Sequence, residues 1–148
     1  MSYSHLLVPV DGSDLGDHAI AKAVELAKTL GARITFFHAE PGLPVALAGL
    51  GEQVDPRTLD MLVTASREQT REILQQACRS AQTAGVNAES RSAMNPIPAE
   101  AIVDTAAEVG ADLIVMASHG RRGLGALLLG SETQKVLTHS SLPVLVVR

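Results

Sequence analysis

Four glycines lie within residues 120–130, directly before Ser131. Glycine lets main-chain N–H groups approach a bound group closely, and a helix starting after such a run adds oriented donors and a positive dipole. Phosphate is the natural ligand of this arrangement. From Ala117 to Arg148 the net charge is +3, in a chain whose total is −4. The stretch therefore predicts an anion site, and a solvated loop that needs glycine for its turns stays open as the alternative.

A second candidate is the turn Asp11-Gly12-Ser13, which follows an apolar run and offers a carboxylate, a flexible residue and a hydroxyl. Ligands of open α/β sheets bind at the carboxyl ends of strands, where the winding reverses. Ser13 can also cap the helix that follows, so the turn is equally typical of an ordinary helix start. Both interpretations stay open at this point.

Known glycine signatures fit neither stretch. A Walker A loop needs glycine followed by lysine, and this sequence has no such pair. The dinucleotide fingerprint fails because Leu128 stands where its third glycine belongs, after Gly123 and Gly125. Residues 12–16 do not have the spacing of a nucleophile elbow. A P-loop enzyme and a standard NAD site are therefore excluded.

The elements that position these residues alternate between two hydrophobic periods. Short continuous apolar runs predict buried strands, and apolar residues at three- and four-residue steps predict helices between them. We expect strands at residues 5–10, 34–39, 88–93, 113–117 and 144–147. We expect helices at residues 14–30, 56–84 and 99–109, and a last helix that Ser131 opens with Gln134 completing a capping box. Residues 40–54 have no usable period and are expected to form a long loop.

Strands that alternate with helices pair in parallel, because each helix returns the chain to the same edge of the sheet. The sequence thus predicts an α/β fold: one doubly wound, five-stranded parallel sheet with helices on both faces, a Rossmann-like domain over residues 1–148. Its core should be aliphatic, because aromatic residues make up only 2% of the chain. The strand at 144–147 would leave an apolar edge if it lies outermost, so we expect a homodimer paired there.

The composition excludes several classes of protein. A net charge of −4 and the absence of tryptophan argue against a nucleic-acid partner. The single cysteine, Cys78, rules out a disulfide framework and fits a reducing cytoplasm. The five histidines show no metal-ligand spacing, so we expect no metal site. No apolar run reaches the roughly 18 residues of a membrane helix, so we expect a cytoplasmic protein without a membrane partner.

The sequence resembles the universal stress protein family, in particular its ATP-binding branch, over its whole length. The resemblance is carried by residues 8–13 (Val-Pro-Val-Asp-Gly-Ser), His38, residues 118–131 and residues 143–147 (Pro-Val-Leu-Val-Val). That branch has Gly-x-x-Gly, nine residues, and then Gly-Ser or Gly-Thr. Gly120, Gly130 and Ser131 match, whereas Ala117 replaces the first glycine. A methyl group there is tolerated at negative φ and costly at positive φ.

The resemblance implies an ATP site, with Asp11 near the ribose or a hydrated Mg or Mn ion held by the phosphates. The positions implied for the adenosine are Pro9, Val10, Asp11, Ala39 (through its main chain), Met116 and Ala117. The positions implied for the phosphates are Gly120, Gly130, Ser131, Glu132 and Thr133, mostly through N–H groups, with the hydroxyls of Ser131 and Thr133 adding to them.

These residues suit holding a nucleotide better than hydrolysing it. An ATPase must position water and neutralise charge on the leaving phosphate. Near this site the sequence offers one carboxylate, Asp11, and the glycine-rich loop has no lysine. The adjacent side chains of Ser118 and His119 are expected to point apart. We therefore predict an ATP-binding stress-response module without catalytic residues, with at most slow hydrolysis, whose nucleotide state changes its shape or its unidentified protein partner.

Two other functions are alternatives to this one. A nucleotide-free dimeric stress protein, the other branch of the family, acts through protein partners and is favoured by Ala117. An adenylating or pyrophosphatase-type enzyme would need Ser-Gly-Gly-x-Asp-Ser after the first strand, which the sequence Asp-Gly-Ser-Asp at residues 11–14 does not provide. The sequence does not distinguish ATP from AMP.

Overall fold

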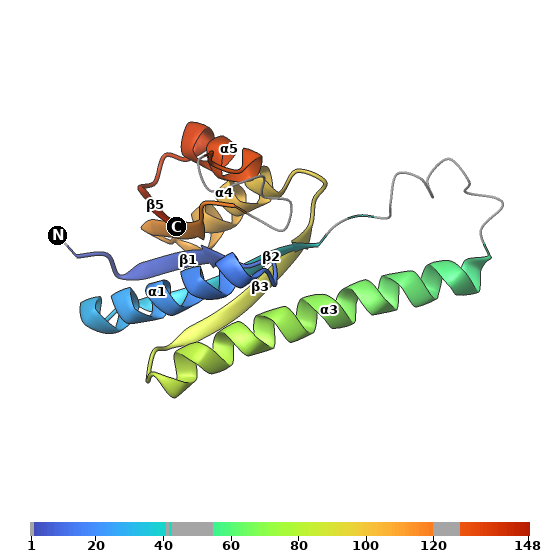
Figure 1. Ribbon diagram of the computed structural model, residues 1–148, viewed down its shortest axis with the longest axis horizontal. Coiled ribbons are helices and arrows are strands. Elements are labelled where there is room, and N and C mark those ends of the chain that lie inside the picture. The colour runs from blue at the N-terminus through green and yellow to red at the C-terminus, as the bar shows by residue number, and fades with distance from the viewer. Residues whose placement is uncertain (1, 41, 43–54, 120–127) are drawn as a thin grey trace.

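Short apolar runs form the strands of one parallel sheet, as predicted (Figure 1). The computed structural model describes residues 2–40, 42, 55–119 and 128–148. The strands are β1 (His5–Pro9), β2 (Arg33–Glu40), β3 (Ala88–Met94), β4 (Leu113–Ala117) and β5 (Val144–Val147). They lie in the order β3-β2-β1-β4-β5, and every neighbouring pair is parallel. This order is that of a Rossmann-like, doubly wound sheet, so the predicted fold class is confirmed.

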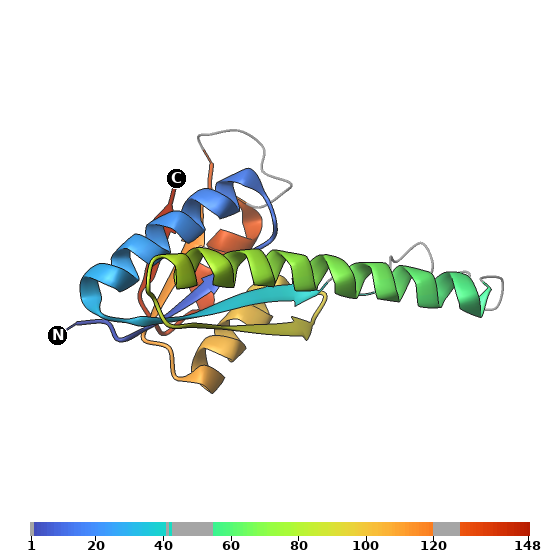
Figure 2. The same ribbon diagram turned by 90° about the horizontal axis from the view of Figure 1, so that it is seen from below.

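Helices cover both faces of this sheet (Figures 1 and 2). The described residues contain α1 (Asp14–Leu30), α3 (Pro56–Thr83), α4 (Pro98–Val109) and α5 (Ser131–His139). Apolar residues of α1 and α3 form one core cluster with the sheet, and those of α4 and α5 form a second. The sheet is therefore the middle of three layers.

Side chains along each strand divide between these two clusters, because successive residues of a strand point to opposite faces. Leu6 and Val8 pack with α1 and α3, whereas Leu7 packs with α4 and α5. The two phenylalanines of the chain, Phe36 and Phe37, are buried on opposite faces. The remaining core of the described residues is aliphatic, as the composition predicts.

Most predicted helix ends are confirmed. Ser13 caps α1, since its Oγ accepts a hydrogen bond from the Gly16 N–H at 3.0 Å. Gly31 ends α1 and Gly110 ends α4 in the left-handed conformation, with φ of 68° and 73°. Pro98 starts α4, where its missing N–H costs nothing.

The start of α5 differs from the prediction. Its N-cap is Gly130, in an extended conformation with ψ of 153°, and Ser131 is the first helical residue. No side chain caps this end, and Gln134 instead donates from Nε2 to the Leu129 carbonyl at 2.8 Å. The capping-box prediction is wrong because the N-cap is Gly130, so the helix begins one residue earlier than the motif requires.

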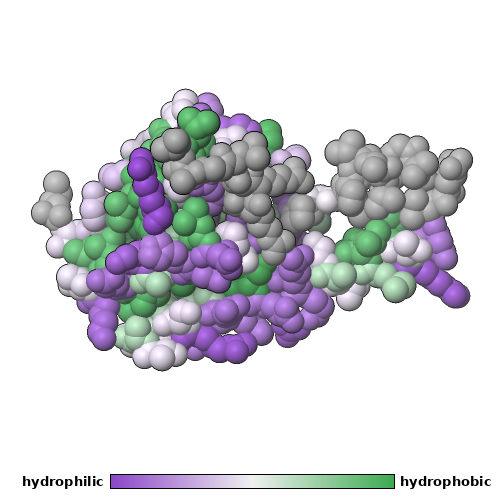
Figure 3. All heavy atoms as spheres, viewed as in Figure 1, coloured by the Kyte–Doolittle hydropathy of each residue, from purple (hydrophilic) through white to green (hydrophobic). Residues whose placement is uncertain are grey.

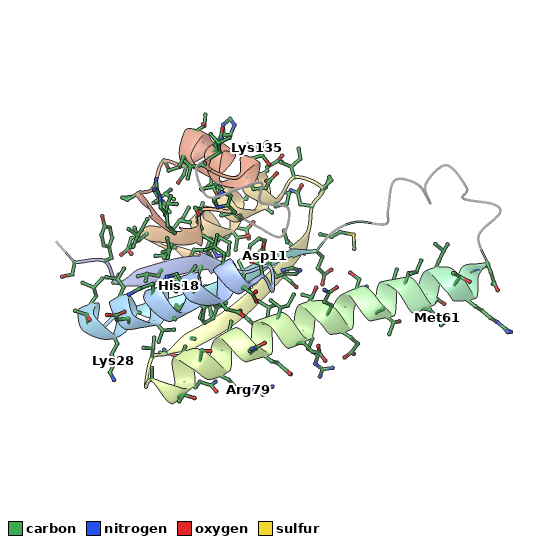
Figure 4. All side chains as sticks on the ribbon, in the orientation of Figure 1. Asp11, His18, Lys28, Met61, Arg79 and Lys135 are labelled. Atoms are coloured by element: carbon green, nitrogen blue, oxygen red, sulfur yellow. The ribbon has the colours of Figure 1, made fainter. Side chains whose placement is uncertain are left out.

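Two elements are less buried than the sequence suggests. β3 lies at an edge of the sheet and all but its first residue are exposed. The buried residues of α3 lie between Thr70 and Ala81, and its first half projects beyond the sheet, where Met61 is 72% exposed (Figures 2 and 4). Residues 43–54, within the predicted loop, lie outside the described residues. No helix in the described parts of the chain is long and apolar enough to cross a membrane.

A buried polar chain links the amino-terminal parts of three strands. His5 is 2% exposed, and its Nε2 donates to Thr35 Oγ1 at 2.7 Å. The Thr35 hydroxyl donates in turn to Glu89 Oε1 at 3.0 Å. Burial, together with the nearby Arg33 guanidinium, lowers the pKa of His5 below its ordinary value of 6.5. The folded protein therefore disfavours the charged form of this imidazole.

This histidine predicts a loss of stability in mild acid. When the pH falls below 6.5, the ordinary pKa of histidine, His5 is protonated more readily in the unfolded chain than in the folded protein. The free energy of unfolding therefore falls as the pH falls. Urea unfolding should show a lower midpoint at about pH 5.5 than at about pH 7.5 in the wild type, and a flatter dependence in His5→Gln. An identical pH dependence in the variant would assign the effect to another group.

Candidate functional site

The winding of the sheet reverses between β1 and β4, and the carboxyl ends of these strands separate. Their pairing stops at Leu7 opposite Ile114, although β1 continues to Pro9 and β4 to Ala117. The helix after β1 packs on one face, and the helix after β4 packs on the other. Such a switch point opens a crevice where ligands of doubly wound folds bind.

The first turn of α5, the helix that follows β4, carries N–H groups that have no acceptor among the described residues. An α-helix cannot satisfy its first N–H groups internally. The first main-chain bond of α5 runs from the Gln134 N–H to the Gly130 carbonyl at 3.0 Å. The N–H groups of Ser131, Glu132 and Thr133 have no acceptor among the described residues. Together with the positive end of the helix dipole, these three amides can bind an anion.

Two hydrogen bonds fix this turn to the end of β4. The Gly130 N–H donates to the Ser118 carbonyl at 2.7 Å. The Thr133 hydroxyl, in a side chain 2% exposed, donates to the Ala117 carbonyl at 3.0 Å. The Gly130 amide and the Thr133 hydroxyl, both implied by the resemblance to face the phosphates, are thus engaged within the protein. Ser131 is exposed, and neither its hydroxyl nor its amide has a hydrogen-bond partner among the described residues.

The carboxylate of Glu132 points away from these amides. Its Oε2 accepts a hydrogen bond from the Ala99 N–H, in the first turn of α4, at 2.8 Å. Its Oε1 lies 3.3 Å from Lys135 Nζ. Only the main chain of Glu132 therefore remains to bind an anion at α5.

Asp11 lies directly after β1, where α1 begins (Figure 4). Its Oδ1 accepts hydrogen bonds from the Ser13 hydroxyl at 2.6 Å and from the Ser13 N–H at 3.0 Å. Ser13 Oγ in turn accepts from Gly16, so carboxylate, hydroxyl and amide form a chain. The turn is therefore both a helix cap and a fixed carboxylate beside the crevice.

The remaining adenosine candidates lie at the ends of β1, β2 and β4. Val10 and Met116 are buried, while Pro9, Ala39 and Ala117 are half-buried. Ala117 is the last residue of β4, and no described residue other than glycine has a positive φ. The methyl group of Ala117 therefore causes no backbone strain.

Ser118 and His119 do not point apart as expected. Ser118 Oγ lies 2.8 Å from His119 Nδ1, within hydrogen-bond distance. Ser118 is 3% exposed, and the buried Nε2 atom of His119 has no hydrogen-bond partner within residues 2–40, 42, 55–119 and 128–148. Gly120, which the resemblance implies for the phosphates, lies outside the described residues.

A groove of about 330 Å³ between α1 and α3 is a separate feature. Its lining includes the acids Asp17 and Glu72 and no basic residue, so it does not suit an anion. Within residues 2–40, 42, 55–119 and 128–148, no group of three or more His, Cys, Asp or Glu side chains could hold a metal ion.

A five-stranded parallel sheet in this order, with helices on both faces, defines a Rossmann-like α/β protein. The family model described as "Universal stress protein family" matches residues 2–148. The chain belongs to this family, as the motifs around Asp11 and Ser131 predict.

Known relatives support the same assignment. The chain is 35% identical to the universal stress protein YxiE of Bacillus subtilis over 148 residues, covering 99% of each chain. A universal stress protein family member from Burkholderia pseudomallei has a solved structure that matches with a TM-score of 0.77 and 31% identity, over 98% of this chain and 96% of that one. A universal stress protein solved in complex with cAMP matches with a TM-score of 0.71 and 27% identity, over 100% and 98% of the two chains.

Gly16 lies so close to the side chains of Asp11 and Ser13 that replacing it by alanine should destabilise the protein. Replacing glycine by alanine inside a helix normally stabilises a protein by about 0.5–1 kcal/mol. A Cβ at Gly16 would lie 2.9 Å from Asp11 Oδ1 and 3.0 Å from Ser13 Oγ. Gly16→Ala should therefore lower the free energy of unfolding, by about 1 kcal/mol, in urea titrations.

A double-mutant cycle identifies the cause. In an Asp11→Ala background the carboxylate is gone, so Gly16→Ala should cost less than in the wild type. An equal cost in both backgrounds would show that the Asp11 contact does not limit the space at Gly16.

Proposed function

We propose that this chain binds ATP in the crevice between β1 and β4, with the phosphates at the first turn of α5. The observation that carries the proposal is the set of three N–H groups, at Ser131, Glu132 and Thr133, that have no acceptor in the described parts of the chain and lie at the helix after the switch-point strand β4. Main-chain amides at a helix N-terminus favour anionic groups such as phosphate. The related universal stress protein solved with cAMP supports an adenine nucleotide as the ligand.

The adenosine would lie over the ends of the central strands. Of the apolar residues there, Pro9 is half-buried while Val10 and Met116 are buried, and Ala39 would offer main-chain groups to the adenine edge. Ala117 fits this proposal because it has ordinary backbone geometry in β4. A divalent ion, Mg or Mn, would be held by the nucleotide phosphates, with Asp11 nearby.

The proposed activity is binding with at most slow hydrolysis. Fast phosphoryl transfer needs a group that positions water and cations that neutralise the developing charge. The carboxylate of Glu132 is held by Ala99, and Oδ1 of Asp11 is held by Ser13. The protein would thus act as a nucleotide-responsive stress protein in the cytoplasm, whose occupancy alters a protein partner.

Ser131→Pro tests the site with little disturbance of the fold. Proline is favoured at the first helical position, and Gly130 before it already has the extended backbone that proline requires. The variant removes one free amide together with the Ser131 hydroxyl. Isothermal titration should show micromolar-range binding of ATP to the wild type and binding weaker by about tenfold in Ser131→Pro, at an unchanged melting temperature.

Ser131→Ala is the matched control, because it removes the hydroxyl and keeps the amide. It should bind ATP more tightly than Ser131→Pro. Equal ATP affinities for wild type and Ser131→Pro would place the phosphates elsewhere. A wild type that binds no adenine nucleotide would favour the alternative, a nucleotide-free dimeric stress protein that acts through protein partners.

We further propose that two copies pair through β5. This strand lies at the edge of the sheet and consists of Val144, Leu145, Val146 and Val147, with Leu145 43% exposed. Figure 3 shows hydrophobic residues grouped around this end of the molecule. The opposite edge strand, β3, carries Glu89 and Arg91 instead, and charged residues discourage pairing. A second copy would give β5 the backbone partners that it lacks.

Light scattering should therefore give a dimer mass for the wild type and a larger monomer fraction for Leu145→Lys, because an edge lysine opposes strand pairing. Leu62→Lys is the matched control, since Leu62 on α3 is 41% exposed, and it should remain dimeric. A monomeric wild type at micromolar concentration, or equal effects of the two lysines, would contradict pairing through β5.

A further inference from the structure

The Glu132 side chain joins the first turns of two helices. Its Oε2 accepts the Ala99 N–H at 2.8 Å, across 33 residues of sequence. α4 has no side-chain cap of its own, because its N-cap is Ile97 and its first helical residue is Pro98. Glu132 therefore supplies, from another helix, the carboxylate acceptor that the start of α4 lacks.

Glu132 also belongs to the first turn of α5, which carries the three free amides. Gly130 and Thr133 hold this turn to β4, and Glu132 holds it to α4. The turn is thus fixed in two directions. Amides that are held in place before a ligand arrives bind it more tightly, because less freedom is lost on binding.

We propose that Glu132 is a positioning residue for the phosphate site at α5. Its bond to Ala99 orients the first turn of α5 and keeps its own carboxylate away from the bound anion. This inference rests on the proposed function of ATP binding. It gives the Glu132 side chain a role through α4 rather than through contact with the nucleotide.

Two effects of the carboxylate on an anion oppose each other. Its negative charge repels phosphate, while its bond to Ala99 orients the amides that bind phosphate. The repulsion is weak, because Lys135 lies 3.3 Å away and the Glu132 side chain is 37% exposed to screening solvent. The orienting bond is a charge-assisted hydrogen bond in a partly buried place, so positioning outweighs repulsion.

Paired substitutions separate the two effects in ATP titrations. Glu132→Ala removes both charge and acceptor and should weaken ATP binding by about fivefold to tenfold. Glu132→Gln keeps an oxygen that can accept from Ala99, so its affinity should lie closer to the wild type. Binding by Glu132→Ala that equals or exceeds the wild type would overturn the proposal, because repulsion would then dominate.

Ser140→Ala controls for lost stability alone. Ser140 lies at the other end of α5, where its Oγ accepts from the Leu142 N–H at 3.0 Å. This variant should lower the melting temperature and leave ATP affinity unchanged. If it weakens ATP binding as much as Glu132→Ala does, the role of Glu132 is merely structural.

A nucleotide-free readout distinguishes failure of this inference from failure of the proposed function. In amide hydrogen exchange without ATP, the Ala99 N–H should exchange more slowly in the wild type than in Glu132→Ala, because its hydrogen bond to the Glu132 carboxylate is lost in that variant. A wild type that shows this protection and binds no ATP keeps the α4–α5 link but refutes both nucleotide binding and positioning. A wild type that binds ATP without this protection refutes only the role of Glu132.

Discussion

The attachment of α5 to the end of β4 fixes the position of the first turn of α5, on which the proposed site depends. The Thr133 hydroxyl and the Gly130 amide bond to the carbonyls of Ala117 and Ser118, so the helix must begin where the strand ends. A helix that begins there leaves N–H groups that its own turns cannot satisfy. Unpaired polar groups are costly when they lose water, so a ligand that replaces that water must bring acceptors of its own. A phosphate oxygen is such an acceptor.

Ala117, which stands where the resemblance leads us to expect a glycine, fits this attachment without backbone strain. The residue contributes a strand backbone and a carbonyl that accepts from Thr133, and neither needs a positive φ. A rule that strictly requires glycine at position 117 would place this chain outside the nucleotide-binding branch of the family. The backbone of Ala117 gives no reason for such a rule, because its φ is not positive. Membership of the universal stress protein family is established, and nucleotide binding at the first turn of α5 is the proposal built on it.

The sequence predicts what depends on local periodicity and composition. Continuous apolar runs such as Leu113–Ala117 identify the strands, and Ser13 and Gly31 identify the ends of α1. The sequence predicts that β3 and α3 exist, but not that β3 and the first half of α3 are exposed. Periodicity does not show which edge of a sheet a strand occupies. Parallel order then follows from the alternation of strands and helices.

Contacts between distant residues are not predicted from the sequence. Nothing near Glu132 indicates that its carboxylate caps α4, because Ala99 is an unremarkable apolar residue. The N-cap of α5 is Gly130 rather than Ser131, and this likewise depends on a distant contact, the bond from the Gly130 N–H to the Ser118 carbonyl. An ATP titration followed by amide-resolved NMR tests the account most directly. It predicts saturable shifts at Ser131, Glu132 and Thr133, and saturable binding that leaves these three signals unmoved would contradict it.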